Sequence, residues 1–135
     1  MERIKVEIHW YDKNYACVYD YPGFGCVAVT NKTLDGLKHD FIESLHWHIE
    51  SSIEDGDFVP DFLRSNFSVD FVLATSALLR NAEQFTTMAA ISRVTGINQR
   101  LLSNYASEVK RPRPAQREKI IAGLYEIGKQ FLAMC

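Results

Sequence analysis

The stretch Thr87–Pro114, TMAAISRVTGINQRLLSNYASEVKRPRP, decides how the rest of the chain is interpreted. Its first part carries apolar residues at Met88, Ile91 and Val94, the spacing of a short helix that a preceding threonine can cap. Gly96 then ends the helix, because a sharp turn there needs a positive φ, which glycine adopts at little cost. Apolar residues return at helical spacing after the turn, and they predict a second helix capped by an asparagine.

Two short helices joined by a glycine turn are typical of a helix-turn-helix, whose second helix enters the major groove of DNA. We expect the polar residues of the second helix to read bases: Asn98, Gln99, Arg100, Ser103 and Asn104. A basic segment follows, in which two prolines prevent the helix from continuing. We expect nearby cations to contact phosphates: Lys110, Arg111, Arg113 and Arg117. The alternative is a plain helical hairpin with a solvated polar face.

The distribution of charge favours DNA binding over the plain hairpin. Residues 86–135 hold 8 Lys or Arg and 3 Asp or Glu, a balance of +5. Residues 1–85 hold 7 Lys or Arg and 14 Asp or Glu, a balance of −7, so the whole chain has a formal net charge of −2. Positive charge gathered at the end that carries the helix-turn-helix fits phosphate binding by that end alone.

Length and composition bound the class of protein. With 135 residues, 47 % of them hydrophobic, the chain suffices for one ordinary domain or two small ones with buried cores. No apolar run predicts a transmembrane helix, and the opening residues MERIKVEIHWYDKNY do not form a signal peptide. The three cysteines lack metal-ligand spacing, and their odd number favours reduced thiols in a cytoplasm. We expect Cys17 and Cys26 to be small core residues within strands.

The first half of the chain alternates in strand-like segments. Period-2 patterns predict strands over residues 3–10, 15–19, 26–30 and 67–73. A helix from Thr33 to about Ser51 should cross one face of three antiparallel strands. The buried stripe expected for this helix consists of Leu34, Leu37, Phe41, Leu45, His48 and Ile49. Residues 54–66 predict an acidic loop with at most one turn of helix.

The second half of the chain is wholly helical in pattern. Besides the two helices of the motif, it predicts helices over residues 75–84 and 115–134. An apolar seam on the last helix, either a dimer contact or part of one domain's core, consists of Ile120, Leu124, Ile127 and Phe131. The predicted fold class is α+β: a βββαβ domain, residues 1–73, followed by an all-α helix-turn-helix domain, residues 74–135.

Together the two halves resemble the HicB family of antitoxins, in the branch with a Cro-like helix-turn-helix at the C-terminus. The N-terminal resemblance rests on VEIHWYDKNYACVYDYPGFGCVAVTNKTLDGL, the helix through HWHIE, the DGDFVPDFL loop and the FSVDF strand. The C-terminal resemblance rests on ISRVTGINQRLLSNYASEVKRPRPAQREKIIAGLYEIG. Two positions depart from the Cro-like pattern: Ser92 stands where alanine is usual, and Glu108 stands where glycine often follows the recognition helix.

The resemblance implies a degenerate RNase H-like N-terminal domain that binds a small RNA-cleaving toxin, HicA, and a C-terminal domain that represses the pair's own operator. A toxin that grips RNA must be basic, so we expect the densest acidic cluster to contact it: Glu54, Asp55, Asp57 and Asp61. Cro-like domains usually bind paired half-sites, so we expect a homodimer or a higher homo-oligomer. No cofactor, metal or membrane partner is expected, and the chain should be cytoplasmic.

Two other functions compete with an antitoxin that has no chemistry of its own. One is a stand-alone helix-turn-helix regulator whose N-terminal domain senses a ligand or another protein. The other is a metal-dependent nuclease, which would require convergence of Asp12, Asp20 and Asp40. One helix also pairs histidines with glutamates at i,i+4, a spacing that suggests metal chemistry but lacks a third ligand at standard spacing: His39 with Glu43, and His46 with Glu50.

Overall fold

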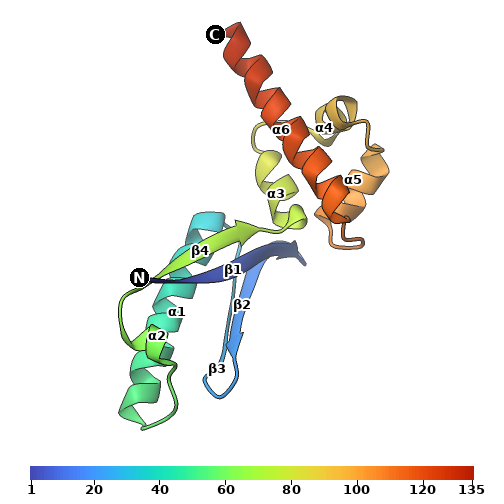
Figure 1. Cartoon of the computed structure of the whole chain (residues 1–135). Helices are drawn as coiled ribbons and strands as arrows, with labels where there is room; N and C mark the ends of the chain where they lie inside the picture. Colours follow the sequence, from blue (N-terminus) through green and yellow to red (C-terminus); the bar gives the residue numbers. More distant parts are fainter. The chain divides into compact units, whose positions relative to one another are not determined.

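The computed structural model describes residues 1–135 and divides into two compact units, Met1–Ala74 and Thr75–Cys135. The first unit is a four-stranded mixed sheet with two helices, and the second consists of four helices (Figure 1). The chain is therefore a mixed α+β protein. None of its helices combines the length and the apolar character needed to span a membrane.

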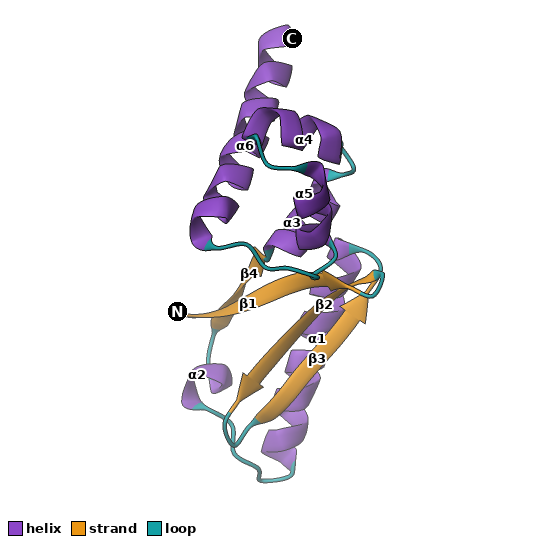
Figure 2. Ribbon diagram, turned by 90° about the vertical axis from the view of Figure 1, so that its right-hand side faces the viewer, coloured by secondary structure: helices purple, strands orange, loops and turns teal.

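The sheet is built from four strands. β1 (Glu2–Tyr11), β2 (Asn14–Tyr21) and β3 (Gly25–Asn31) pair as consecutive antiparallel strands, as expected from the sequence. β4 (Phe67–Leu73) lies beside β1 and runs parallel to it, which gives the order β3-β2-β1-β4 (Figure 2). The sequence pattern did not predict the parallel pairing, because alternation along a strand defines its two faces and not its neighbour. β3 and β4 are thus the two edges of the sheet.

α1 (Leu34–Glu54) covers one face of the sheet (Figure 2). Thr33 caps it as predicted, because its Oγ1 accepts a hydrogen bond from Gly36 N at 3.1 Å. The side chains buried between helix and sheet include Leu37, Phe41, Leu45 and Ile49 from α1 and Ile4, Val6, Ile8, Tyr15, Cys17 and Val27 from the strands. α2 (Asp61–Arg64) is the single helical turn expected within the acidic loop.

Three residues predicted for this core are not fully buried, and the first of them, Leu34 at the start of α1, is half-buried. His48 is only half-buried, because its Nε2 reaches outward to Phe24 O at 2.7 Å. Cys26 is exposed, since it faces the opposite way from buried Val27 on the same strand. Cys17 is buried as predicted, and burial raises the pKa of its thiol to about 11, so the thiol is protonated and unreactive at neutral pH.

The second unit consists of α3 (Thr75–Ala82), α4 (Met88–Thr95), α5 (Gln99–Ala106) and α6 (Pro114–Met134). Its core contains Leu79, Ile91, Ile97, Leu102, Tyr105 and Ile120. The last helix begins one residue earlier than the pattern predicted. The fixed φ of proline and its missing N–H suit the first position of a helix, so Pro114 starts α6 instead of preceding it.

Candidate nucleic-acid interface

The turn between α4 and α5 is held by short hydrogen bonds. Gly96 ends α4 with φ 76°, the positive value that the sequence predicted. Thr95 Oγ1 donates to Ile91 O at 2.7 Å and accepts from Ile97 N at 3.1 Å. Ser92 Oγ donates to Ile97 O at 2.6 Å, which gives this serine a structural role at the position where the resemblance to Cro-like motifs leads us to expect alanine. Since the Ile97 side chain is itself buried, these bonds fix the point at which α5 starts.

Both helices of the motif are capped by the residues that the sequence indicated. Thr87 Oγ1 accepts from Ala90 N at 3.0 Å at the start of α4. Asn98 Oδ1 accepts from Arg100 N at 2.8 Å at the start of α5. The amide oxygen of Asn98 is therefore already engaged, so this residue positions the helix and is a poorer base reader than its neighbours.

The outward face of α5 presents polar side chains to solvent. Gln99, Arg100 and Ser103 are exposed, and Asn104 is half-buried. Leu102 on the opposite face is completely buried, which fixes the rotation of the helix about its axis. The first turn of α5 thus offers one amide and one guanidinium, the two groups that bind adenine and guanine edges best.

The cations predicted to contact phosphates are not equivalent. Lys110 and Arg113 are exposed. Arg111 Nε lies 3.1 Å from Glu108 Oε2, and Arg117 Nη1 donates to Thr75 Oγ1 at 2.9 Å. Arg111 is therefore partly neutralised and Arg117 serves the packing of its own unit, which leaves Lys110 and Arg113 as the better phosphate ligands.

Glu108 follows α5, at the position where the resemblance to Cro-like motifs leads us to expect glycine. Its φ is 63°, in the left-handed region that favours glycine. Its side chain is only 9 % exposed, with Oε1 accepting from Ser76 Oγ at 2.6 Å and Oε2 paired with Arg111. The carboxylate is thus turned into the unit, where these partners offset its desolvation. Sequence reasoning missed this role because Ser76 lies 32 residues earlier.

The apolar seam on α6 divides between core and surface. Ile120 is completely buried, and Leu124 and Ile127 pack against the core of the second unit. Phe131 is 53 % exposed, because α6 extends past the other helices of its unit (Figure 1). Leu132 and Met134 are exposed beside it. Of the predicted seam, Phe131 is therefore the residue most exposed to a second chain.

The acidic residues predicted to contact a toxin are all exposed: Glu54, Asp55, Asp57 and Asp61. Phe58 lies among them and is also exposed. Its ring packs against Gly23, in the turn between β2 and β3, where an added Cβ would lie 3.2 Å from Phe58 Cδ2. The acidic loop is thereby attached to the turn from which β3 begins.

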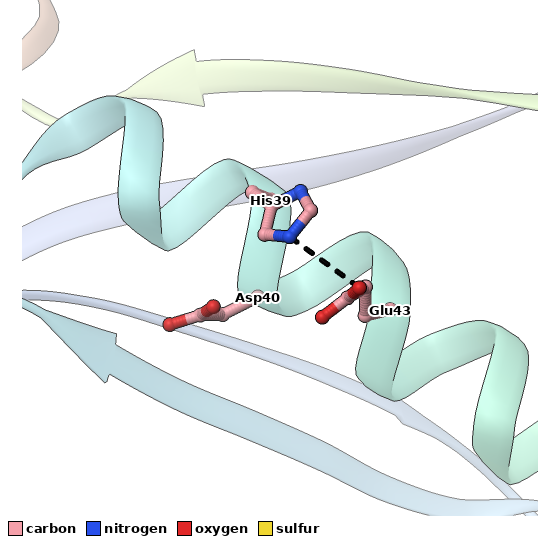
Figure 3. A group of neighbouring side chains, drawn as sticks. All are labelled: His39, Asp40 and Glu43. Atoms are coloured by element: carbon pink, nitrogen blue, oxygen red, sulfur yellow. Dashed lines mark ion pairs between the residues drawn. The ribbon is translucent and has the colours of Figure 1, made fainter.

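One group on α1 has donor atoms that could hold a metal ion. The donor atoms of His39, Asp40 and Glu43 lie within 4.8 Å of one another. His39 Nε2 is 3.4 Å from Glu43 Oε1, whereas the Asp40 carboxylate points away from this pair (Figure 3). Asp40 Oδ2 accepts from Asn31 Nδ2 at 2.9 Å, which ties α1 to the end of β3. An ion pair and a hydrogen bond account for these contacts, so we assign no metal here.

Two of the three carboxylates of the nuclease hypothesis, Asp12 and Asp20, lie far apart. Asp12 lies in the turn before β2, and Asp20 lies near the end of that strand. The extended strand from Asn14 to Asp20 separates the turn from Asp20 by roughly 20 Å. A two-metal site requires carboxylates around ions about 4 Å apart, so Asp12 and Asp20 cannot share one.

Comparison with protein-family models, with curated proteins and with solved structures finds no match to this chain. Its function is therefore inferred from its own residues and their geometry.

Proposed function

We propose that the chain is an antitoxin of the HicB type, which neutralises a small, basic, RNA-cleaving toxin and represses its own operon by binding operator DNA. One observation carries the DNA-binding part: Gln99, Arg100 and Ser103 are exposed along a helix whose start is fixed by its cap and by the buried turn before it. A major-groove reader needs this combination of exposed polar groups and a rigid support.

The basic segment supports phosphate contacts next to the reading helix. Lys110 and Arg113 follow α5 directly and are exposed. The second unit also holds the positive surplus of the chain, since residues 75–135 contain 9 Lys or Arg and 4 Asp or Glu. Such a distribution attracts the backbone of DNA without requiring a basic protein overall.

Replacing Lys110 and Arg113 together with alanine should flatten the salt dependence of DNA binding. Each phosphate contact contributes a slope of about −0.9 to log K against log salt, so the slope should become less steep by about 1.8. Arg111→Ala should change it less, because Glu108 already neutralises that cation. Fluorescence anisotropy at several salt concentrations measures the slope, with the exposed Lys129→Ala as control. An unchanged slope in the double variant would show that the basic segment does not contact DNA phosphates.

A homodimer on a palindromic operator is part of this proposal. One recognition helix contacts too few bases for high specificity, and two-fold symmetric proteins double the number of contacts. Exposed Phe131, Leu132 and Met134 at the end of α6 support a contact between two chains there. The number of chains bound per DNA duplex measures directly whether the chain binds as a dimer.

The toxin-binding part is supported by the exposed acidic loop and by the negative surplus of the first unit, where residues 1–74 contain 6 Lys or Arg and 13 Asp or Glu. Co-expression with the product of the neighbouring gene tests it. We expect a small basic protein that arrests growth alone, is harmless with this chain and co-purifies with it. If the neighbour neither binds nor is neutralised while DNA binding persists, the chain is a stand-alone regulator.

A further inference from the structure

The two edges of the sheet are protected to different degrees. β4 carries Asp70 at its middle, and this carboxylate lies 3.8 Å from Arg3 Nη1 on the neighbouring strand. β3, with the sequence GCVAVTN, contains neither a charged residue nor a proline. Natural proteins usually block an edge strand with charge, proline or a bulge, because its unpaired N–H and C=O groups would otherwise pair with another chain. β3 is an edge without such a block.

A groove of about 770 Å³ lies between this edge and α1. Cys26, Val27 and Ala28 line it from the strand. Successive side chains on a strand point to opposite faces, so these three side chains do not all face the groove. The part of the strand that they have in common there is the backbone at the free edge. Trp47 lines the groove from α1 and is 69 % exposed, although tryptophan is normally well buried in a folded protein.

Two contacts between α1 and the strand set the width of the groove. Asn31, at one end of β3, donates to Asp40 at 2.9 Å. Beyond the other end, His48 Nε2 donates to Phe24 O at 2.7 Å. The helix is therefore held at both ends of the strand, and the groove between them is preformed, which lowers the entropy that a bound segment must lose.

We propose that the free edge of β3 accepts an extended strand from a partner protein and that the partner's side chains facing α1 are basic and apolar. Addition of a strand satisfies the unpaired backbone groups, and the adjacent groove selects the side chains. Glu43 and Glu50 lie four residues before and three after Trp47, so the three share one helix face. None of the ten residues that line the groove is Lys or Arg. A basic segment is thus the complementary occupant.

This inference rests on the proposed function in one respect, because the toxin expected there is basic. It places the partner contact along β3 and α1, beside the acidic loop that the sequence indicated. The loop and the groove are continuous in the fold, since Phe58 of the loop packs against the turn that precedes β3.

A second copy of the chain is the less suitable occupant. Antiparallel pairing of two β3 strands about a two-fold axis would put both α1 helices on the same face of the joined sheet. Glu43 and Glu50 of each chain would then approach their equivalents in the other, and like charges brought together at an interface are unfavourable. A basic strand would instead meet these carboxylates as a counter-charge.

Peptide binding to the ¹⁵N-labelled full chain tests the proposal. The probe is a blocked heptapeptide that alternates valine and lysine, and the matched peptide alternates valine and glutamate. We expect the valine–lysine peptide to shift amide resonances of β3 and of α1 around Trp47, and to slow hydrogen exchange of the outward amides of β3. The valine–glutamate peptide should bind at least about tenfold more weakly.

A matched pair of variants distinguishes peptide binding at the edge of the sheet from binding on its exposed face. Ala28 and Val18 are opposite partners on the exposed face, but only Ala28 belongs to the edge strand. Ala28→Lys should weaken binding of the valine–lysine peptide about tenfold, because it adds a blocking charge to the edge. Val18→Lys should change the affinity for this peptide less than about twofold. Trp47→Ala should also weaken it about tenfold, without loss of fold since the side chain is exposed.

Three results would overturn the proposal. The peptide could leave the amide resonances of β3 unchanged, or Ala28→Lys and Val18→Lys could weaken peptide binding equally. Alternatively, the outward amides of β3 could already be protected from hydrogen exchange in the concentrated chain without peptide. The last result would show that a second copy occupies the edge. Neither DNA nor toxin is present in this experiment. Its failure would therefore leave the antitoxin proposal intact, and failure of growth rescue would leave the edge-strand proposal intact.

Discussion

Gly123→Ala will lower the free energy of unfolding of the helical unit by about 1–3 kcal/mol, although alanine is the better helix former. A Cβ at Gly123 would overlap Cγ2 of Thr95 on α4. Thr95 cannot rotate away without losing its hydrogen bonds to Ile91 O and Ile97 N. α6 would have to move away from α4, which would open the core around Ile120.

Gly128→Ala is the matched control on the same helix. Apart from its chain neighbours and the backbone of its own helix, nothing lies within 4 Å of a Cβ added at Gly128, so this change should stabilise the unit by up to about 1 kcal/mol. Urea unfolding followed by helical circular dichroism measures both variants. Tryptophan fluorescence serves as an internal reference, because Trp10 and Trp47 both belong to the first unit. A neutral or stabilising Gly123→Ala would contradict the close approach of α4 and α6.

Gln99→Ala should weaken binding to the operator by about 1–3 kcal/mol, or about 5- to 150-fold, and should change binding to random DNA little. Gln99 is exposed on the first turn of α5, where a side-chain amide can pair with both Hoogsteen-edge groups of an adenine. Alanine at this position favours the helix, so the change removes base contacts and leaves the fold intact.

The same substitution at Gln130 provides the control. Gln130 is an exposed glutamine near the C-terminal end of α6, where its Nε2 donates to Glu126 Oε1 at 3.0 Å. Its replacement should leave operator binding within about twofold of the original. Parallel titrations on operator and random duplexes distinguish the two roles. Equal loss on both duplexes for Gln99→Ala would show that this side chain does not read bases.

Local signals predicted the elements of this fold well. Thr33, Thr87 and Asn98 act as caps through hydrogen bonds to residues two or three positions ahead, so sequence spacing alone reveals them. Gly96 likewise predicts a turn, because the positive φ of this turn depends only on the local backbone. Strand alternation gave the buried face of β1, because the period of side-chain direction is a property of the strand itself.

Contacts between distant residues were the part that the sequence did not reveal. Arg117 was expected on phosphate, yet it bonds Thr75, which lies 42 residues earlier. The parallel pairing of β4 with β1 and the position of the β3–α1 groove both depend on the order of the strands. The exposure of Cys26 depends on which face of β3 packs against α1. No period or spacing encodes the order of strands, so the groove beside exposed Trp47 emerges only from the fold.

Titration of the full chain with two DNA duplexes is the most direct test of the proposed function. One duplex covers the region upstream of the chain's own gene, and the other has the same composition in scrambled order. We expect two chains per upstream duplex and a preference of about 10³-fold or more over the scrambled one at physiological salt. Equal affinity for the two duplexes, or no binding to either, would contradict the proposed function.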